Sequence, residues 1–308
     1  MTPIHNWIHR LRKGDEVAYL VTLASACSII VITALLVIEL YKNSALPRAK
    51  FGWAFLTGTT WDPVAGDFGA LPFIYGTIVT SALALLIGVP IGIGAAVFLA
   101  ELAPPRLSSI LAFLIELLAA VPSVIIGLLG VFVLIPILKD VQPYIKAVLG
   151  WTPLFQGPFY GVSLFSAGIV LAIMILPFVI SISREVILSV PGDQREAAFA
   201  LGATRWETTW DVVLPNARKG ILGSVFLSLA RALGETMAVT MVVGNDPKIH
   251  ASLFSPGYSI AAVIANEFTE ATGDLYTGAL IEIALVLFGL TAVINAIARL
   301  LVAKRGEA

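Results

Sequence analysis

The sequence predicts an all-α membrane protein that forms a single transmembrane permease-like domain over residues 1–308 and crosses the bilayer about six times. Two observations support this prediction. First, 58% of the 308 residues are hydrophobic and only 13% are charged, whereas a typical soluble domain carries about 25% charged residues. Second, the chain contains six long apolar runs, and a helix needs about 20 apolar residues to cross a bilayer. Lipid is therefore the expected solvent.

The predicted spans are the apolar runs at residues 17–38, 73–100, 107–138, 161–183, 220–244 and 275–298. The first run is longer than the roughly 7–15 apolar residues of a signal peptide, so we expect a retained helix. In the second run, Gly88, Gly92 and Gly94 are small residues that allow helices to approach closely. The third run is too long for one straight span, and Pro122 is expected to break it.

Lysine and arginine residues are distributed unevenly between the two sides of the predicted spans. With the N-terminus inside, the inner segments hold twelve of these residues and the outer segments hold six. Basic segments tend to stay on the cytoplasmic side of a membrane. We therefore expect both termini and the inner loop at residues 184–219 in the cytoplasm.

Several classes of function are disfavoured by what the sequence lacks. The net charge of −1 argues against a nucleic-acid binder, which needs a basic surface. Cys27 is the only cysteine, and the three histidines are not spaced as a metal site. The chain has no Gly-x-x-x-x-Gly-Lys-Ser/Thr motif and no Ser-His-Asp or Cys-His arrangement. We therefore expect no enzymatic activity and no bound cofactor in this chain.

The inner loop at residues 184–219 predicts two short helices. Asp193 with Glu196, and Thr204 with Glu207, each have the three-residue spacing of a capping box at the start of a helix. Both pairs therefore predict a helix start.

A bend between these two helices is expected at Gly202, because glycine tolerates backbone angles that other residues avoid. The second helix is expected to end at Pro215. Four side chains would give the bent unit apolar faces: Phe199, Leu201, Trp206 and Trp210.

The order and spacing of residues 196–215 resemble the EAA loop of ABC-importer permeases. That loop reads Glu-Ala-Ala, three residues, Gly, and nine residues before a Val/Ile-x-Leu-Pro ending. The matching positions are Glu196, Ala197, Ala198, Gly202, Leu214 and Pro215. The resemblance implies that the short helices dock into a groove on a separate ATPase subunit. A purely structural loop, packed on its own helices, is the alternative.

Three further segments narrow the resemblance. They are Phe98-Leu99-Ala100-Glu101, Pro122-Ser123-Val124 with Gly127 and Gly130, and Arg231-Ala232-Leu233-Gly234-Glu235-Thr236-Met237-Ala238-Val239. Together they resemble the phosphate-specific ABC transporter permeases, and the last segment resembles the PstC type. The resemblance covers about residues 70–300 and implies the type I ABC-importer permease fold.

This resemblance also implies a function and a set of partners. The chain would belong to an importer of inorganic phosphate in the bacterial cytoplasmic (inner) membrane, and would form the translocation path with a second permease of the PstA type. Two ATPase subunits of the PstB type would bind ATP and Mg. A phosphate-binding protein of the PstS type would deliver substrate from outside.

Two charges lie inside the fifth apolar run. Arg231 is 11 residues past Gly220, or roughly 16 Å along a helix, which is near the middle of the bilayer. Glu235 follows at i+4 and is expected on the same helix face. The two residues form either a structural ion pair or, as the resemblance favours, part of an anion path gated by Glu235. Ser123 is assigned to the same path from its place in the resembling segment.

Three other functions remain open. A permease of the same class for sulfate or molybdate would keep the inner loop but should lose the Arg-x-x-Gly-Glu-Thr run. A secondary transporter or channel would need no ATPase, and the EAA-like loop counts against it. A membrane scaffold would have little use for an arginine at mid-span, where a charge is costly.

Overall fold

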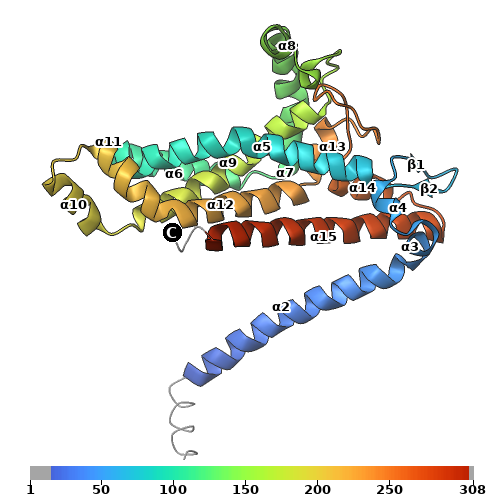
Figure 1. Cartoon of the computed structure of the whole chain (residues 1–308), viewed down its shortest axis with the longest axis horizontal. Coiled ribbons are helices and arrows are strands. Elements are labelled where there is room, and N and C mark those ends of the chain that lie inside the picture. Colours follow the sequence, from blue (N-terminus) through green and yellow to red (C-terminus); the bar gives the residue numbers. More distant parts are fainter. Residues whose placement is uncertain (1–14, 305–308) are drawn as a thin grey trace, which may run out of the picture.

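The computed structural model describes residues 15–304 and consists almost wholly of helices (Figure 1). The first part holds α2 (Asp15–Asn43), α3 (Ala45–Phe51), α4 (Ala54–Thr57), strands β1 (Trp61–Asp62) and β2 (Asp67–Phe68), and α5 (Leu71–Val97). The middle part holds η1 (Phe98–Leu102), α6 (Pro105–Ala119), α7 (Ser123–Leu129), η2 (Gly130–Leu134), α8 (Ile135–Leu149), η3 (Pro153–Phe155) and α9 (Leu164–Leu188). The last part holds α10 (Gly192–Ala200), α11 (Arg205–Glu207), η4 (Thr208–Val213), α12 (Leu214–Gly234), α13 (Met237–Val242), α14 (Ile260–Glu267) and α15 (Asp274–Lys304).

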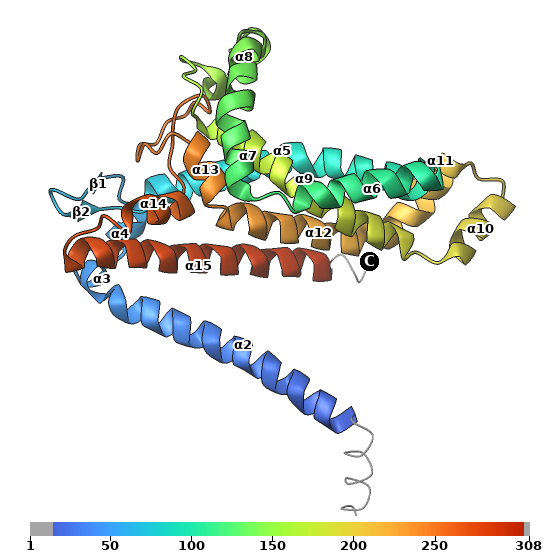
Figure 2. The same cartoon turned by 180° about the vertical axis from the view of Figure 1, so that it is seen from behind.

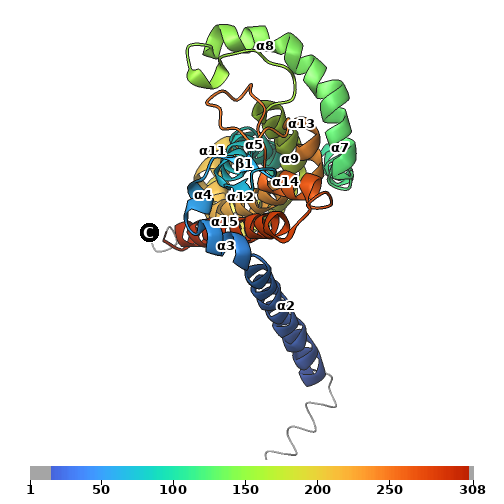
Figure 3. The ribbon, with the colours of Figure 1, turned by 90° about the vertical axis from the view of Figure 1, so that its right-hand side faces the viewer.

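Four long helices, α5, α9, α12 and α15, run along the long axis of the molecule, and α6 lies beside them (Figures 1 and 2). Helix α2 leaves this bundle at an angle, and the segment from α7 to α8 turns away across the bundle axis (Figure 3). Five helices in the described part of the chain are long and apolar enough to cross a bilayer: Glu16–Asn43, Leu71–Leu102, Ser123–Leu149, Leu164–Leu188 and Asp274–Ala298. The remaining predicted span contains most of α12, whose first turns also carry Arg218 and Lys219.

Among the described elements, the most extensive packing between two helices joins α5 to α9. A Cβ atom added at Gly88 would lie 3.0 Å from the side chain of Ile175, and one at Gly92 would lie 2.6 Å from the side chain of Val179. The predicted role of these two glycines in close helix approach is therefore confirmed. At Gly94, no other element in the described part of this chain lies within 4 Å of the position of a Cβ, so the role predicted for this glycine stays a prediction.

The third predicted span breaks where Pro122 led us to expect. Helix α6 ends at Ala119, Pro122 has an extended backbone with ψ 137°, and α7 begins at Ser123. The extended residue lets the chain change direction, and α7 and α8 then leave the axis of the bundle (Figure 2).

The fifth predicted span also breaks, which the sequence did not lead us to expect. Helix α12 ends at Gly234, Glu235 has an extended backbone with ψ 127°, and α13 begins at Met237. Glu235 Oε1 accepts a hydrogen bond of 3.4 Å from the backbone N–H of Ala238. This bond satisfies one of the N–H groups that the start of a helix leaves without an intrahelical partner.

The end of the bundle far from α10 is held together by carboxylates. Trp61 Nε1 and Tyr276 Oη each donate to Glu267 Oε2 at 2.8 Å. Arg48 Nη1 lies 3.4 Å from Glu282 Oε2, and the Glu282 side chain is only 12% exposed. These contacts attach the segment between α2 and α5 to α14 and α15.

One close backbone approach on α5 yields a stability prediction. A Cβ at Gly76 would lie 2.1 Å from the carbonyl oxygen of Tyr258, which side-chain movement cannot relieve. We expect Gly76→Ala to lower the free energy of unfolding by about 1–3 kcal/mol, the usual cost of overpacking. Gly94→Ala, on the same helix but in open space, is the matched control. Thermal unfolding of both variants in detergent measures the effect, and equal melting temperatures would contradict this packing.

Candidate functional site

The inner loop at residues 184–219 folds into two helical arms that meet at Gly202. The first arm is α10, and the second is the run of α11, η4 and α12. Gly202 has a φ of +88°, a left-handed conformation that residues with a Cβ rarely adopt. The predicted bend is therefore found at the predicted residue. Both α10 and α11 lie at the same end of the bundle as the end of α15 (Figure 1).

Only one of the two predicted capping boxes forms. Thr204 Oγ1 accepts a hydrogen bond of 3.3 Å from the Glu207 N–H, and Glu207 Oε2 accepts one of 2.7 Å from the Thr204 N–H. Two hydrogen bonds lower the pKa of Glu207: the larger effect comes from the backbone N–H of Thr204 and the smaller one from the Thr204 hydroxyl. Asp193 is not a cap, because Pro191 is already extended and α10 begins one residue before Asp193.

The prediction that Pro215 ends the second helix is wrong. Helices α11 and α12 are joined through the π-helical segment η4 without a gap, and Pro215 lies in the first turn of α12. In a π-helix the backbone hydrogen bonds join residues i and i+5, so η4 changes the hydrogen-bond register just before the first turn of α12. A proline in a first turn needs no intrahelical N–H bond.

Apolar side chains are exposed along both arms of the inner loop. Trp206 and Trp210 stack with ring centroids 5.9 Å apart and are 56% and 60% exposed. Leu201, beside the bend, is 91% exposed. Together with the exposed Phe199, these residues form what we call the inner-loop patch: Phe199, Leu201, Trp206 and Trp210.

The six positions of the EAA-like loop do not share one environment. Glu196 and Ala197 are exposed on α10, whereas Ala198 is buried. Leu214 is half-buried and Pro215 is exposed at the start of α12. The first two residues therefore face outward, and Ala198 packs α10 against its own chain.

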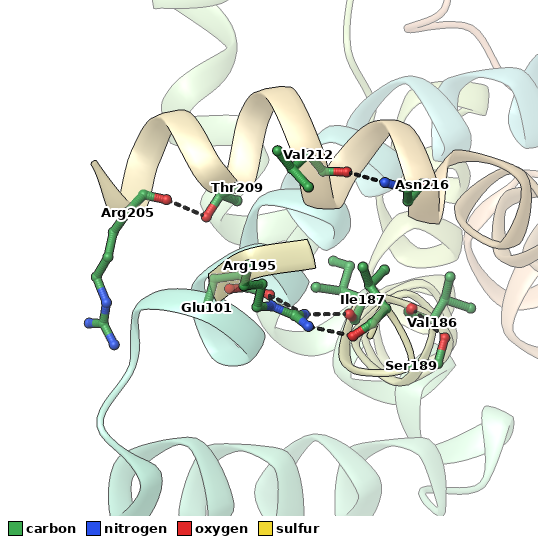
Figure 4. A network of polar contacts seen from close by, with 10 residues as sticks. Glu101, Val186, Ile187, Ser189, Arg195, Arg205, Thr209, Val212 and Asn216 are labelled. Carbon is green, nitrogen blue, oxygen red and sulfur yellow. Dashed lines mark hydrogen bonds and ion pairs between the residues drawn. The ribbon is translucent and has the colours of Figure 1, made fainter. Parts of the chain in front are cut away.

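A polar contact that the sequence did not predict attaches α10 to the bundle (Figure 4). Arg195 Nη2 lies 2.7 Å from Glu101 Oε1 and donates to the carbonyl oxygen of Ile187 at 2.9 Å, while Nη1 donates to that of Val190. Each partner belongs to a motif visible in the sequence, but the pair is 94 positions apart. Nothing in the sequence of one chain connects them.

Arg231 and Glu235 do not form the expected ion pair among the residues that the structure describes. Because α12 ends at Gly234, Arg231 and Glu235 do not lie on one continuous helix, and their side chains are not placed on the same face by the i+4 spacing. The guanidinium carbon of Arg231 instead lies 4.3 Å from the ring centroid of Phe178 on α9. Arg231 is exposed, and Glu235 is half-buried beside α13.

The two helix breaks lie close together in space because α7 packs against α13. A Cβ at Gly127 would lie 3.0 Å from the Cα of Ala238. Ser123 is half-buried at the first position of α7, and Glu235 precedes α13. The structure thus brings the two breaks, and the elements that carry the three predicted path residues, into one region.

The comparison with protein families agrees with this architecture. Residues 88–306 match the family described as "Binding-protein-dependent transport system inner membrane component". The chain belongs to this family. The match includes both helix breaks and the whole inner loop.

Relatives of this family resemble the chain over nearly its full length. It is 48% identical over 297 residues to the phosphate transport system permease protein PstC of Mesorhizobium japonicum, which covers 95% of this chain and 91% of the relative. It is 44% identical over 303 residues to the protein of the same name from Haemophilus influenzae, which covers 97% and 94%.

Solved structures of ABC transporters share the fold. A bacterial alginate ABC transporter in complex with its pentasaccharide-bound periplasmic protein matches with a TM-score of 0.59 at 17% identity, covering 94% of this chain and 96% of that chain. The MetNI methionine ABC transporter matches with a TM-score of 0.55 at 16% identity, covering 80% and 99%. The predicted type I ABC-importer permease fold is confirmed.

Proposed function

We propose that this chain is the permease subunit of an ATP-driven importer of inorganic phosphate. The observation that carries the proposal is the identity of 44% to 48%, over almost the whole chain, with phosphate transport permeases named PstC. The inner-loop patch supports coupling to another subunit. A purely structural loop would bury such side chains against its own helices. These side chains are exposed instead, and large exposed apolar clusters mark interaction surfaces.

The proposal assigns the inner loop to an ATPase. Glu196, Ala197 and the inner-loop patch dock into a groove on one ATPase subunit. The two ATPase subunits of the assembly bind ATP and Mg, while this chain binds neither. A second, homologous permease completes the translocation path, and a phosphate-binding protein delivers the substrate. The assembly lies in the bacterial inner membrane with both termini in the cytoplasm.

Within the path, we assign the contact with phosphate to Arg231. Phosphate carries one to two negative charges near neutral pH, and an unpaired charge is costly to move through a low-dielectric region. A guanidinium stays charged and offers a planar fork of donors to two phosphate oxygens. The Phe178 ring holds this group in place by a cation–π contact. Glu235 stabilises the helix break through Ala238, so its gating role does not depend on pairing with Arg231.

Reconstitution tests the proposed function directly. The chain is incorporated with its cognate permease, ATPase and binding protein into proteoliposomes, and ATP-dependent uptake of phosphate, sulfate and molybdate is compared. We expect phosphate to accumulate and the other two anions not to. Accumulation of sulfate or molybdate instead would support the alternative cargo, and uptake without the ATPase would support a secondary transporter.

The bend of the inner loop yields a prediction about coupling. A β-branched side chain at φ +88° costs roughly 1–2 kcal/mol of backbone strain, so Gly202→Val should distort the docking unit. We expect loss of most ATP-driven uptake with normal membrane insertion. Gly192→Val is the matched control, since Gly192 lacks a positive φ and has open space around its Cβ. Equal uptake by the two variants would remove the docking assignment.

The assignment of Arg231 makes a separate prediction. Arg231→Gln should leave assembly and ATP hydrolysis intact but abolish phosphate uptake, whereas Arg231→Lys, which keeps the charge without the fork, should retain part of it. Because Arg231 and Glu235 are not paired, adding Glu235→Gln should not restore uptake. Uptake at the wild-type rate in Arg231→Gln, or its recovery in the double variant, would exclude Arg231 from the path.

Exposed positions at the two ends of the bundle allow the orientation to be tested. Val64, between β1 and β2, is 98% exposed, and Leu201 is 91% exposed. In a Cys27→Ser background, Val64→Cys should react with an impermeant maleimide added outside the cell. In cells that lack the ATPase subunits, so that the inner-loop patch is uncovered, Leu201→Cys should react only after the membrane is permeabilised. The opposite labelling pattern would reverse the proposed orientation.

A further inference from the structure

Arg195 connects three elements at the base of the bundle. It lies on α10, and its guanidinium reaches Glu101 in η1, the backbone carbonyl of Ile187 in the last turn of α9, and that of Val190 just beyond this helix. Figure 4 shows Glu101 and Ile187 on either side of the Arg195 guanidinium. A helix end leaves carbonyls without intrahelical partners, and a basic side chain satisfies them well.

This contact differs from an ordinary surface ion pair. The side chains of Arg195 and Glu101 are 19% and 13% exposed, so solvent screens them only partly. The chain offers a direct comparison in Arg184 and Glu185, which are adjacent in sequence and have side chains 22% and 71% exposed. Exposed pairs contribute little to stability, whereas removing one partner of a sheltered pair leaves the other charge poorly compensated.

The position of the Arg195–Glu101 pair determines which other helices are displaced when α10 moves. Helices α9 and α10 are joined by residues 189–191, of which Ser189 has a helical backbone and Pro191 an extended one. The contacts of Arg195 hold α10 against the end of α9, and they also reach η1, which continues α5. The other arm of the loop, beyond Gly202, leads into α12, and α10 also packs on η4 in that arm.

We propose that the Arg195–Glu101 contact carries the movement of α10 into the packed pair of α5 and α9, with Arg195 acting as a positioning residue of the transport cycle. The inference rests on the proposed function, since it concerns how an ATPase docked on α10 acts on the bundle. Glu196 and the inner-loop patch bind the ATPase, and Arg195 passes the displacement on. Without the contact, α10 loses its link to α5 and α9, and its displacement reaches the bundle only through η4 and α12.

The experiment measures phosphate uptake and ATP hydrolysis in the same proteoliposomes and reports their ratio. The variants are Arg195→Gln, Glu101→Gln and the double variant in the complete transporter, with Glu185→Gln as the control. Each single variant should retain its ATPase subunits and hydrolyse ATP, while uptake per ATP falls by about tenfold, within the usual range of coupling between sites. The double variant should be no worse than the poorer single variant, because both changes remove the same contact.

Two results would overturn the proposal. One is a wild-type ratio in either single variant, and the other is a double variant in which the two losses multiply. If Arg195→Gln fails to assemble, Arg195→Lys replaces it, since lysine keeps the charge but lacks the fork that reaches all three acceptors. A lowered ratio in Arg195→Lys supports the linkage, and a wild-type ratio overturns it. Failure of the proposed function is distinguishable, because the wild-type complex would then take up no phosphate.

Discussion

The packing of α5 against α9 supports both the inner loop and the proposed path. In lipid, helices gain little from the hydrophobic effect when they associate, so they rely on tight packing at small residues. Gly88 and Gly92 provide this packing against Ile175 and Val179. The two helices carry the base to which Arg195 attaches α10, and α9 also supplies the Phe178 ring that holds Arg231. A change in this contact would therefore reach both the inner loop and the proposed path.

Local sequence signals predicted local features well where the signal itself fixes the geometry. The bend at Gly202 and the capping box at Thr204 both depend on residues within one turn, and both are found. Asp193 has the same spacing as Thr204 but is no cap, because Pro191 moves the start of α10. The spacing of a capping box is thus informative only when the start of the helix is known.

The interactions that place the candidate site were beyond the reach of the sequence for a different reason. The i+4 pairing of Arg231 and Glu235 assumed a continuous helix, and α12 ends between them. Arg195 and Glu101 are far apart in the chain, and only the packing of α5 on α9 brings their elements together. Composition predicted lipid as the solvent, and hydropathy located four of the six predicted spans, at residues 17–38, 73–100, 161–183 and 275–298, but neither reports which side chains meet.

The π-helical segment η4 sets the rotational phase of α12. A π-helical turn holds one more residue than an α-helical turn does, and each residue of an α-helix turns the chain by about 100°. If residues 208–213 were wound as an α-helix, every later side chain would be rotated by that angle relative to Thr204. Arg231 would then leave the ring of Phe178 and point to another sector of the bundle. The winding of six residues in the inner loop therefore decides where the guanidinium of Arg231, about five turns further along the helix, is aimed.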